Sequence, residues 1–282
     1  RQSIREDGRS LLVYRPITLE TGFIPQANGS ARVKISATDV LVGVKVEIGA
    51  PHPSSPSEGR LEIKAEYIST ASPLYLDKEY AEQQAAELNS VLRTMISSKK
   101  SLDTSKLGII PGHQCWVVYV DCMIMEVDGN VLDTAALAIS AALQTTKVPV
   151  IEVVAGDGPG GKDIEVSDDP YNTIPLPLTS VPVVVTFGRV GNSYIVDASP
   201  TEEACTKAKV SFAINADGEL CALQKSGLGG FGIGHFHSLV KEAPRLARHL
   251  QDQLSATLST ERKLEEHVPL GNVSASKVGF MT

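Results

Sequence analysis

The sequence predicts an α+β fold of two halves, each with a mixed sheet packed against long helices. Two observations predict this fold. Short runs alternate apolar and polar residues, as strands with one buried face do, and a long helix with an apolar stripe follows them. The same order of strands and then a helix occurs a second time. We therefore expect a first half over residues 1–165, a second half over 166–260 and a flexible C-terminal tail over 261–282.

The first half begins with four runs that have strand-like alternation. They are Leu11–Glu20, Ala31–Ser36, Asp39–Gly49 and Arg60–Ser69. The segment Pro51–Glu58 is rich in Pro and Ser, which predicts an exposed loop. A helix should then begin after Asp77, a good N-cap residue, and end near Ser97. Its apolar stripe has helical spacing and comprises Ala81, Ala85, Leu88, Val91, Leu92 and Met95.

A strand-to-helix junction follows at Asp128–Asp133, between an apolar strand over Trp116–Glu126 and an Ala-rich helix over Thr134–Gln144. The unpaired N–H groups and positive dipole end of a helix start favour phosphate binding at such a turn. This junction has no paired glycines and no arginine, and it places the carboxylate of Asp133 at the helix start. We expect Asp133 to be the N-cap, worth about 1 kcal/mol, and the junction to be structural. A buried strand should follow at Val148–Val154.

The second half has four further strand-like runs. They are Val181–Phe187, Ser193–Val196, Lys209–Ile214 and Glu219–Gln224. Asp217-Gly218, between the last two, is a hairpin turn signal. A closing helix is expected from about Phe236 to Leu258, and Pro244 should kink it or mark a restart because proline lacks an amide hydrogen. Its stripe comprises Leu239, Val240, Ala243, Leu246, Leu250 and Leu254.

Composition argues against several functional classes. The net charge of −7 at pH 7 disfavours a broad nucleic-acid-binding surface, although a local basic strip inside a complex would fit. No apolar run approaches the roughly 18 residues of a membrane span, and the polar start of the chain has no secretory signal, so we expect a soluble, intracellular protein without membrane contact. The four cysteines stand singly, which is typical of buried, reduced thiols. They are Cys115, Cys122, Cys205 and Cys221.

Two glycine-rich segments could bind an anion. Gly156–Asp163 matches the P-loop pattern except at its last position, where Asp163 replaces the Ser or Thr that binds magnesium, and acidic residues follow instead of a helix. A stand-alone nucleotide-binding protein using this segment is therefore a weak alternative. Gly227–Gly234 more simply supplies the turn before the last helix. His235 and His237 lack acidic or cysteine partners at ligand spacing, so we expect neither a metal nor a cofactor.

Charged clusters give two further candidates. Glu202 and Glu203 lie on a loop or the first turn of a helix, where carboxylates complement the helix dipole, and we expect solvated surface charges rather than an acid–base pair. Arg93, Lys99 and Lys100 near the end of the first long helix are the best local basic group. They are the candidate RNA-binding residues, and a solvated helix end explains them equally well.

Six segments, taken together and in order, carry a family resemblance. They are Arg5–Arg9, Asn28–Val33, Thr38–Lys45, Asp128–Asp133, Asp163–Tyr171 and Val196–Cys205. They resemble the RNase PH family of 3′→5′ exoribonucleases over about Ile4 to Leu258. Within that family, the NGSARV, DVLVGVK and SDDPY stretches resemble one particular subunit of the eukaryotic RNA exosome ring. The resemblance implies an RNase PH-like fold of the ribosomal protein S5 domain 2-like type.

The departures from active family members concern the catalytic site. Active members carry a Gly-Gly-Thr-Arg phosphate-binding motif where this chain reads Asn130–Thr134, and they place aspartates after the Glu-Glu pair where it reads Ala204–Val210. The resemblance therefore implies a subunit with no catalytic residues, metal or cofactor of its own. Arg93 would match one of the RNA-holding arginines on the first long helix of archaeal relatives.

The resemblance thus implies a non-catalytic ring subunit of the RNA exosome that scaffolds and threads RNA for 3′-end processing and degradation. Its partners would be other RNase PH-like subunits in a six-membered ring, S1- or KH-domain cap subunits, a separate 3′→5′ exoribonuclease and RNA, in the nucleus, nucleolus and cytoplasm. Three alternatives stay open: an active phosphate-dependent exoribonuclease, a nucleotide-binding protein, and the same scaffold role as another ring paralog.

Overall fold

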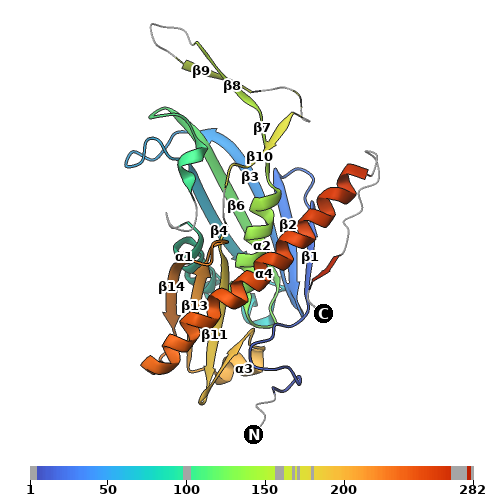
Figure 1. The fold of residues 1–282 in the computed structure, drawn as a ribbon, viewed down its shortest axis with the longest axis vertical. Coiled ribbons are helices and arrows are strands. Elements are labelled where there is room, and N and C mark those ends of the chain that lie inside the picture. The colour runs from blue at the N-terminus through green and yellow to red at the C-terminus, as the bar shows by residue number, and fades with distance from the viewer. Residues whose placement is uncertain are drawn as a thin grey trace.

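The structure, a computed structural model, describes residues 5–97, 103–155, 162–166, 169, 172–178, 181–267 and 278–280. Figure 1 shows a large sheet and a small sheet, one beyond the other along the long axis, with helix α4 (Ile233–His267) running diagonally across both. The mixed α+β fold is confirmed.

The large sheet collects the strands of the first half. Its order is β15-β1-β2-β3-β6-β4, and β5 pairs with β6. Neighbours are antiparallel except β4 and β6, which are parallel. The strands are β1 (Ile17–Thr21), β2 (Gly29–Ile35), β3 (Thr38–Gly49), β4 (Arg60–Tyr67), β5 (Gly108–Ile110), β6 (Gln114–Glu126) and β15 (Val278–Phe280). Each predicted run of the first half contains a strand, although the first begins only at Ile17.

Alternating side chains give the large sheet one fully buried face. Val40, Val42 and Val44 of β3 are completely buried, whereas Leu41 between them is only half-buried. Two helices cover that face: α1 (Lys78–Ile96) packs on β4, and α2 (Val131–Thr145) packs on β2 and β3. Two short 3₁₀ helices complete this part of the chain, at Pro73–Leu76 and Thr104–Leu107.

Helix α1 has the predicted start and the predicted buried stripe. Asp77 is its N-cap and accepts a hydrogen bond from the Glu79 N–H at 3.1 Å. The C-terminal part of the stripe is buried and the N-terminal part is half-buried. The buried members are Leu88, Val91, Leu92 and Met95, and the half-buried members are Ala81 and Ala85.

The small sheet contains the strands of the second half. Its order is β12-β11-β13-β14, and all neighbours are antiparallel. The elements are β11 (Val183–Val190), β12 (Ser193–Val196), the short helix α3 (Pro200–Cys205), β13 (Ala208–Ile214) and β14 (Leu220–Ser226). The predicted turn between β13 and β14 is confirmed, with Gly218 at a φ of 82° and its N–H bonded to the Asn215 carbonyl oxygen at 3.0 Å.

The two halves share one hydrophobic core. Helix α2 contacts β2 and β3 on one side and β11 of the small sheet on the other, so nearly all its side chains are buried. The cluster of buried apolar side chains is continuous from Ile17 in β1 through Phe187 in β11 to Leu258 in α4. A helix whose apolar residues lie on all sides must be buried on all sides, and here the two sheets bury α2 between them. The predicted boundary between residues 165 and 166 falls inside β9 (Lys162–Val166), and its position stays a prediction.

The expected buried strand Val148–Val154 is two separate strands. β7 (Lys147–Pro149) pairs with β10 (Thr173–Pro175) beside the core, and Val148 is fully buried. β8 (Ile151–Ala155) leaves the core after Ile151 and pairs with β9, and its Val153 is 50% exposed. The break follows Pro149, which has no amide hydrogen for a continuous ladder. The prediction of one buried strand is therefore wrong beyond residue 149.

The expected flexible tail is also partly wrong. Helix α4 runs through Pro244 as one element and continues to His267, because its buried stripe extends beyond Leu258 to Glu261. The Glu261 carboxylate accepts a hydrogen bond from the Thr21 hydroxyl at 2.5 Å, which ties the helix to β1. Further on, β15 pairs antiparallel with β1. The edge of β1 thus binds residues 278–280 of the expected tail.

Candidate functional site

The strand-to-helix junction is a tight turn held against the loop after β12. Gly129 (φ 79°) and Asn130 (φ 54°) both adopt the left-handed region, which glycine and asparagine tolerate best. A Cβ at Gly129 would lie 2.4 Å from the carbonyl oxygen of Ala198, so no side chain fits there. From β3, the Thr38 hydroxyl accepts from the Asp128 N–H at 2.8 Å and donates to the Gly129 carbonyl oxygen at 2.7 Å. The junction is therefore a fixed structural contact, as expected.

Asp133 does not cap helix α2. The helix begins at Val131 with Asn130 at the N-cap position, so the prediction of an Asp133 cap is wrong. Asp133 lies in the first turn of the helix and is 3% exposed. Its carboxylate accepts hydrogen bonds from the Thr186 N–H (3.0 Å), the Thr186 hydroxyl (2.6 Å) and the Tyr14 hydroxyl (3.0 Å). It therefore connects α2 to β11 of the small sheet and to the N-terminal segment.

Burial sets the protonation of Asp133. Burial raises the pKa of its carboxyl to about 6, although the hydrogen bonds from Thr186 and Tyr14 favour the charged form. The nearby charge of Asp197 adds to the increase. A buried carboxylate at this place repels any phosphate that approaches the start of α2.

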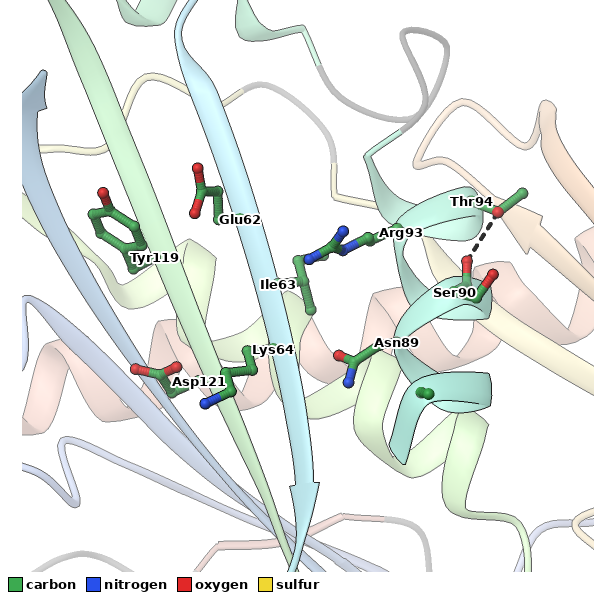
Figure 2. Close-up of a pocket in the computed structure, with 10 residues that line it drawn as sticks. Glu62, Ile63, Lys64, Asn89, Ser90, Arg93, Thr94, Tyr119 and Asp121 are labelled. Atoms are coloured by element: carbon green, nitrogen blue, oxygen red, sulfur yellow. Dashed lines mark hydrogen bonds between the residues drawn. The ribbon is translucent and has the colours of Figure 1, made fainter. Parts of the chain in front are cut away.

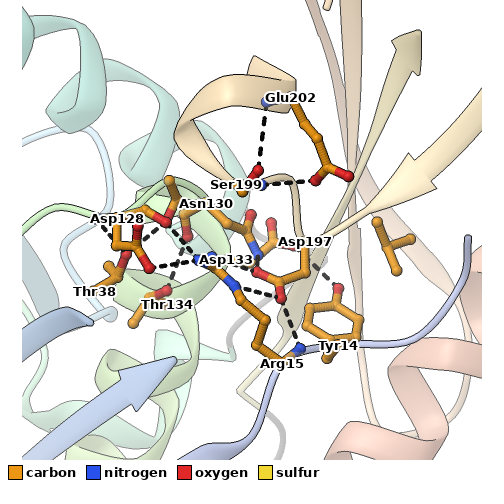
Figure 3. Close-up of polar contacts among 12 residues, drawn as sticks. Tyr14, Arg15, Thr38, Asp128, Asn130, Asp133, Thr134, Asp197, Ser199 and Glu202 are labelled. Carbon is orange, nitrogen blue, oxygen red and sulfur yellow. Dashed lines mark hydrogen bonds and ion pairs between the residues drawn. The ribbon is translucent and has the colours of Figure 1, made fainter. Parts of the chain in front are cut away.

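Asp197 is the centre of a buried ion-pair cluster, which Figure 3 shows beside the junction. Its side chain is 0% exposed, and it accepts from the Arg15 backbone N–H (2.7 Å), two nitrogens of the Arg15 guanidinium (2.9 Å each), Arg9 (2.9 Å) and Asn130 (3.0 Å). Burial acts to raise the pKa of Asp197, but the hydrogen bonds and charge of Arg15, together with Arg9, hold it below its ordinary range. Arg15 also binds the Asp128 carboxylate at 2.9 Å.

The Arg5–Arg9 segment belongs to this same cluster. The Arg5 guanidinium donates to the carbonyl oxygens of Val196 (2.8 Å) and Asp197 (2.6 Å) and forms a two-point ion pair with Glu202. Glu202 also completes a capping box with Ser199 at the start of α3. Of the two predicted placements for the Glu-Glu pair, a loop or a first helical turn, the structure has the helical turn. The expectation of a solvated charge is wrong for Glu202, because Arg5 reaches it from the far end of the chain.

A cavity of about 230 Å³ lies where α1, the start of α2 and the small sheet meet. Stacked Tyr67 and Tyr75 lie at one side, with ring centroids 4.3 Å apart. The other polar lining residues are Gln84, Glu87, Asn130, Thr186, Glu203, Lys209, Ser211, Gln224 and Ser226. The Lys209 ammonium binds the Glu203 carboxylate at 2.6 Å, and that carboxylate also accepts from the Asn130 N–H at 3.3 Å. The lysine therefore neutralises the Glu203 carboxylate beside the start of α2.

The predicted basic group divides between described and undescribed parts of the chain. Lys99 and Lys100 lie outside the described residues, whereas Arg93 is exposed on α1. Figure 2 shows Arg93 reaching from α1 toward Ile63 of β4, across a groove of about 710 Å³. The groove has mixed charge rather than a basic lining. Its charged residues are Glu62, Lys64, Arg93 and Asp121.

The remaining sequence candidates have structural explanations. Most of Gly156–Asp163 lies outside the described residues, and Lys162 begins strand β9, where a P-loop lysine would begin a helix. His235 and His237 are exposed at the start of α4, and the described residues contain no group of three side chains that could hold a metal ion. In the same described part, no helix is long and apolar enough to cross a membrane.

The four cysteines, all in the described part of the chain, form no disulfides, as predicted, but only two are buried. Cys115 and Cys122 lie in the core on β6, and burial raises the pKa of the Cys122 thiol to about 12. Cys221 is half-buried, and Cys205 at the end of α3 is exposed, so the expectation that all four are buried is wrong.

Comparison with known protein families identifies the family of this chain. The profile of the 3′ exoribonuclease family, domain 1, matches residues 13–149, and that of domain 2 matches residues 180–239. The chain belongs to this RNase PH family. Among curated proteins it is similar to Exosome complex component Rrp42 of Methanothermobacter thermautotrophicus, with 37% identity over 225 residues and 80% of each chain covered. It is also similar to the Methanopyrus kandleri protein of the same name, with 34% identity over 257 residues and 91% of each covered.

Solved structures of similar fold also come from exosomes. A chain of the Archaeoglobus fulgidus exosome with RNA bound to the active site matches with a TM-score of 0.76 and 32% identity, over 89% of this chain and 92% of that one. A chain of an archaeal exosome core matches with a TM-score of 0.74 and 31% identity, over 89% and 91%. The predicted resemblance to this exosome component and the RNase PH-like fold are therefore confirmed.

Sequence patterns alone do not identify four of the residues that build the site. Tyr14, Arg15 and Thr186 stand in strand-like runs, where an alternating pattern marks them only as strand positions. Asp197 stood in a segment that was recognised, but its role as an acceptor for two arginines depends on contacts over more than 180 residues of sequence. One sequence signal points to such a cluster: Arg5, Arg9 and Arg15 lie close together in the chain, and buried arginines need carboxylate partners.

Proposed function

We propose that the chain is a non-catalytic, Rrp42-like subunit of an exosome core ring. In this role it pairs with other RNase PH-like subunits and helps to scaffold and thread RNA for 3′→5′ processing and degradation. Support for the assembly comes from the Rrp42 relatives and from the two exosome structures that share its fold at more than 30% identity.

The cavity at the start of α2 carries the argument against catalysis. A phosphate-dependent nuclease must hold phosphate and balance the charge that develops on it, usually with cations and free helix N–H groups. Here Glu203 of the cavity is paired with Lys209, and Asp133 lies buried behind the start of α2. Both arrangements oppose phosphate: the lysine charge is already used, and the buried carboxylate repels the anion.

The RNA-binding part of the proposal rests on Arg93. Its guanidinium is exposed on the face of α1 that borders the groove, where it can bind a backbone phosphate without releasing an ion pair to any described residue. The acidic groove residues Glu62 and Asp121 limit the attraction, so RNA contact through Arg93 would add to contacts made by neighbouring subunits. S1- or KH-domain cap subunits, a separate exoribonuclease, and a nuclear, nucleolar and cytoplasmic location complete the proposal.

Affinity purification of the tagged chain tests the assembly. We expect RNase PH-like subunits to be recovered with it in near-equal amounts, at a mass several times that of the monomer. Lys209→Ala should be recovered with the same partners, because that change affects only the cavity. Recovery of the wild-type chain as a folded monomer without RNase PH-like proteins would contradict the proposal.

A further inference from the structure

The β8–β9 arm, residues 151–155 and 162–166, projects from the fold. Figure 1 shows these two strands beyond the end of the large sheet, joined to the core through β7 and β10. Their main contacts in the described part of the chain are with each other. A two-stranded hairpin alone in water is only marginally stable, because it buries little apolar surface. The arm therefore needs a further surface to become well ordered.

One face of the arm carries four β-branched aliphatic residues. In the antiparallel register Ile151 lies opposite Val166, and Val153 lies opposite Ile164. Directly opposed residues project to the same side of a sheet, so these four β-branched side chains form one continuous face. Val153 is 50% exposed and Val166 is 45% exposed. Ile164 is half-buried, and Ile151 packs against the core. Exposed β-branched residues on a two-stranded sheet are typical of a protein-docking surface.

The other face of the arm carries paired carboxylates. Glu152 lies directly opposite Glu165, and both are exposed. Like charges directly opposite each other destabilise a strand pair. A lysine or arginine placed between the two carboxylates would remove this repulsion. The same charges disfavour RNA and anionic lipid as occupants, because both present phosphates.

We infer that the β8–β9 arm inserts into a groove of a neighbouring RNase PH-like subunit. The groove has an apolar side that covers Val153, Ile164 and Val166, and a lysine or arginine that reaches Glu152 and Glu165. This inference rests on the proposed function, because it takes the neighbour from the ring. A groove covers both faces of the arm at once. A flat partner surface would cover only one face and leave the other exposed to water.

The size of the arm limits its role. A stable interface buries roughly 1,600 Å² in total, far more than ten residues of hairpin can supply. The arm therefore strengthens a larger contact and selects the partner, so its loss should weaken the complex rather than abolish it. A charge placed in the aliphatic face should reduce affinity about tenfold or more, as at a buried interface position.

Two substitutions test the two faces, with the full-length chain and the RNase PH-like subunit recovered with the wild type as the probe. Val153→Glu introduces a charge into the aliphatic face. Glu165→Lys relieves the repulsion with Glu152 inside the free arm but opposes a basic partner. Leu228→Glu is the matched control, because Leu228 is 106% exposed in the loop before α4. Binding is measured by biolayer interferometry, and folding by urea unfolding of each variant.

We expect Val153→Glu to weaken binding about tenfold or more and Glu165→Lys to weaken it severalfold, with Leu228→Glu unchanged. Hydrogen exchange at residues 151–155 and 162–166 should slow when the partner binds. Binding by both arm variants as tight as by the control would overturn the arm inference and leave the ring assignment intact. If the wild-type chain recovers no RNase PH-like subunit at all, both proposals are wrong.

Discussion

Replacing Asp133 by asparagine should change how stability depends on pH. The folded-state pKa of about 6 lies above the ordinary value of 3.8, so the folded chain binds this proton more tightly than the unfolded chain. The stability that the protonated group contributes is fully present below about pH 3.8 and is lost as the pH rises through 6. The gap between the two pKa values corresponds to about 3 kcal/mol.

Asparagine has a similar shape and can still accept from the Thr186 N–H, but it does not titrate. Wild type should therefore lose about 2 kcal/mol relative to Asp133→Asn between pH 4 and pH 7, most of the full difference of about 3 kcal/mol. The assay is urea unfolding followed by fluorescence of Trp116, the single tryptophan, which is 6% exposed in the core. Asp252→Asn, an exposed carboxylate on α4, is the control and should show no such divergence. A constant difference between wild type and Asp133→Asn over this pH range would refute the reasoning.

Three further changes test the packing around the site. Arg15→Ala should lower the free energy of unfolding by about 3–5 kcal/mol, because it leaves the fully buried Asp197 without its main partner; a loss below 1 kcal/mol, again by urea unfolding, would contradict the cluster. Gly129→Ala should cost at least about 2 kcal/mol from the positive φ and the contact with backbone, whereas Gly230→Ala, with open space around it, should leave the melting temperature unchanged. Asn89→Ala should lower the free energy of unfolding by about 1–2 kcal/mol and speed hydrogen exchange in the edge strand β4. The Asn89 side-chain amide accepts from the Ala65 N–H of that strand at 2.6 Å and donates to the Ala65 carbonyl oxygen at 2.9 Å.

Local patterns predicted most elements because those elements are set by local rules. The α1 start follows from the Asp77 cap, and the turn before β14 follows from Asp217-Gly218. The end of α4 was missed because its last buried contact is a carboxylate, Glu261, bonded to Thr21. A polar residue in that position looks like solvent-exposed surface from sequence alone.

The site was only partly predictable for the same physical reason. The sequence shows that a phosphate-binding arginine is absent from the junction, and the structure agrees that the junction is a structural turn. The role of Asp133 could not be derived, because its partners Tyr14 and Thr186 are 119 and 53 residues away. Likewise, Lys209 pairs with Glu203 because the turn between α3 and β13 brings the two side chains together. The sequence alone does not show the geometry of that turn.

We propose that the cavity at the start of α2 does not support phosphorolysis. The most direct test incubates the purified chain with single-stranded RNA and inorganic phosphate and measures release of nucleoside diphosphates. We predict no phosphate-dependent release above that of a heat-denatured sample. Release of nucleoside diphosphates that requires phosphate and is lost in Glu203→Gln would contradict the account.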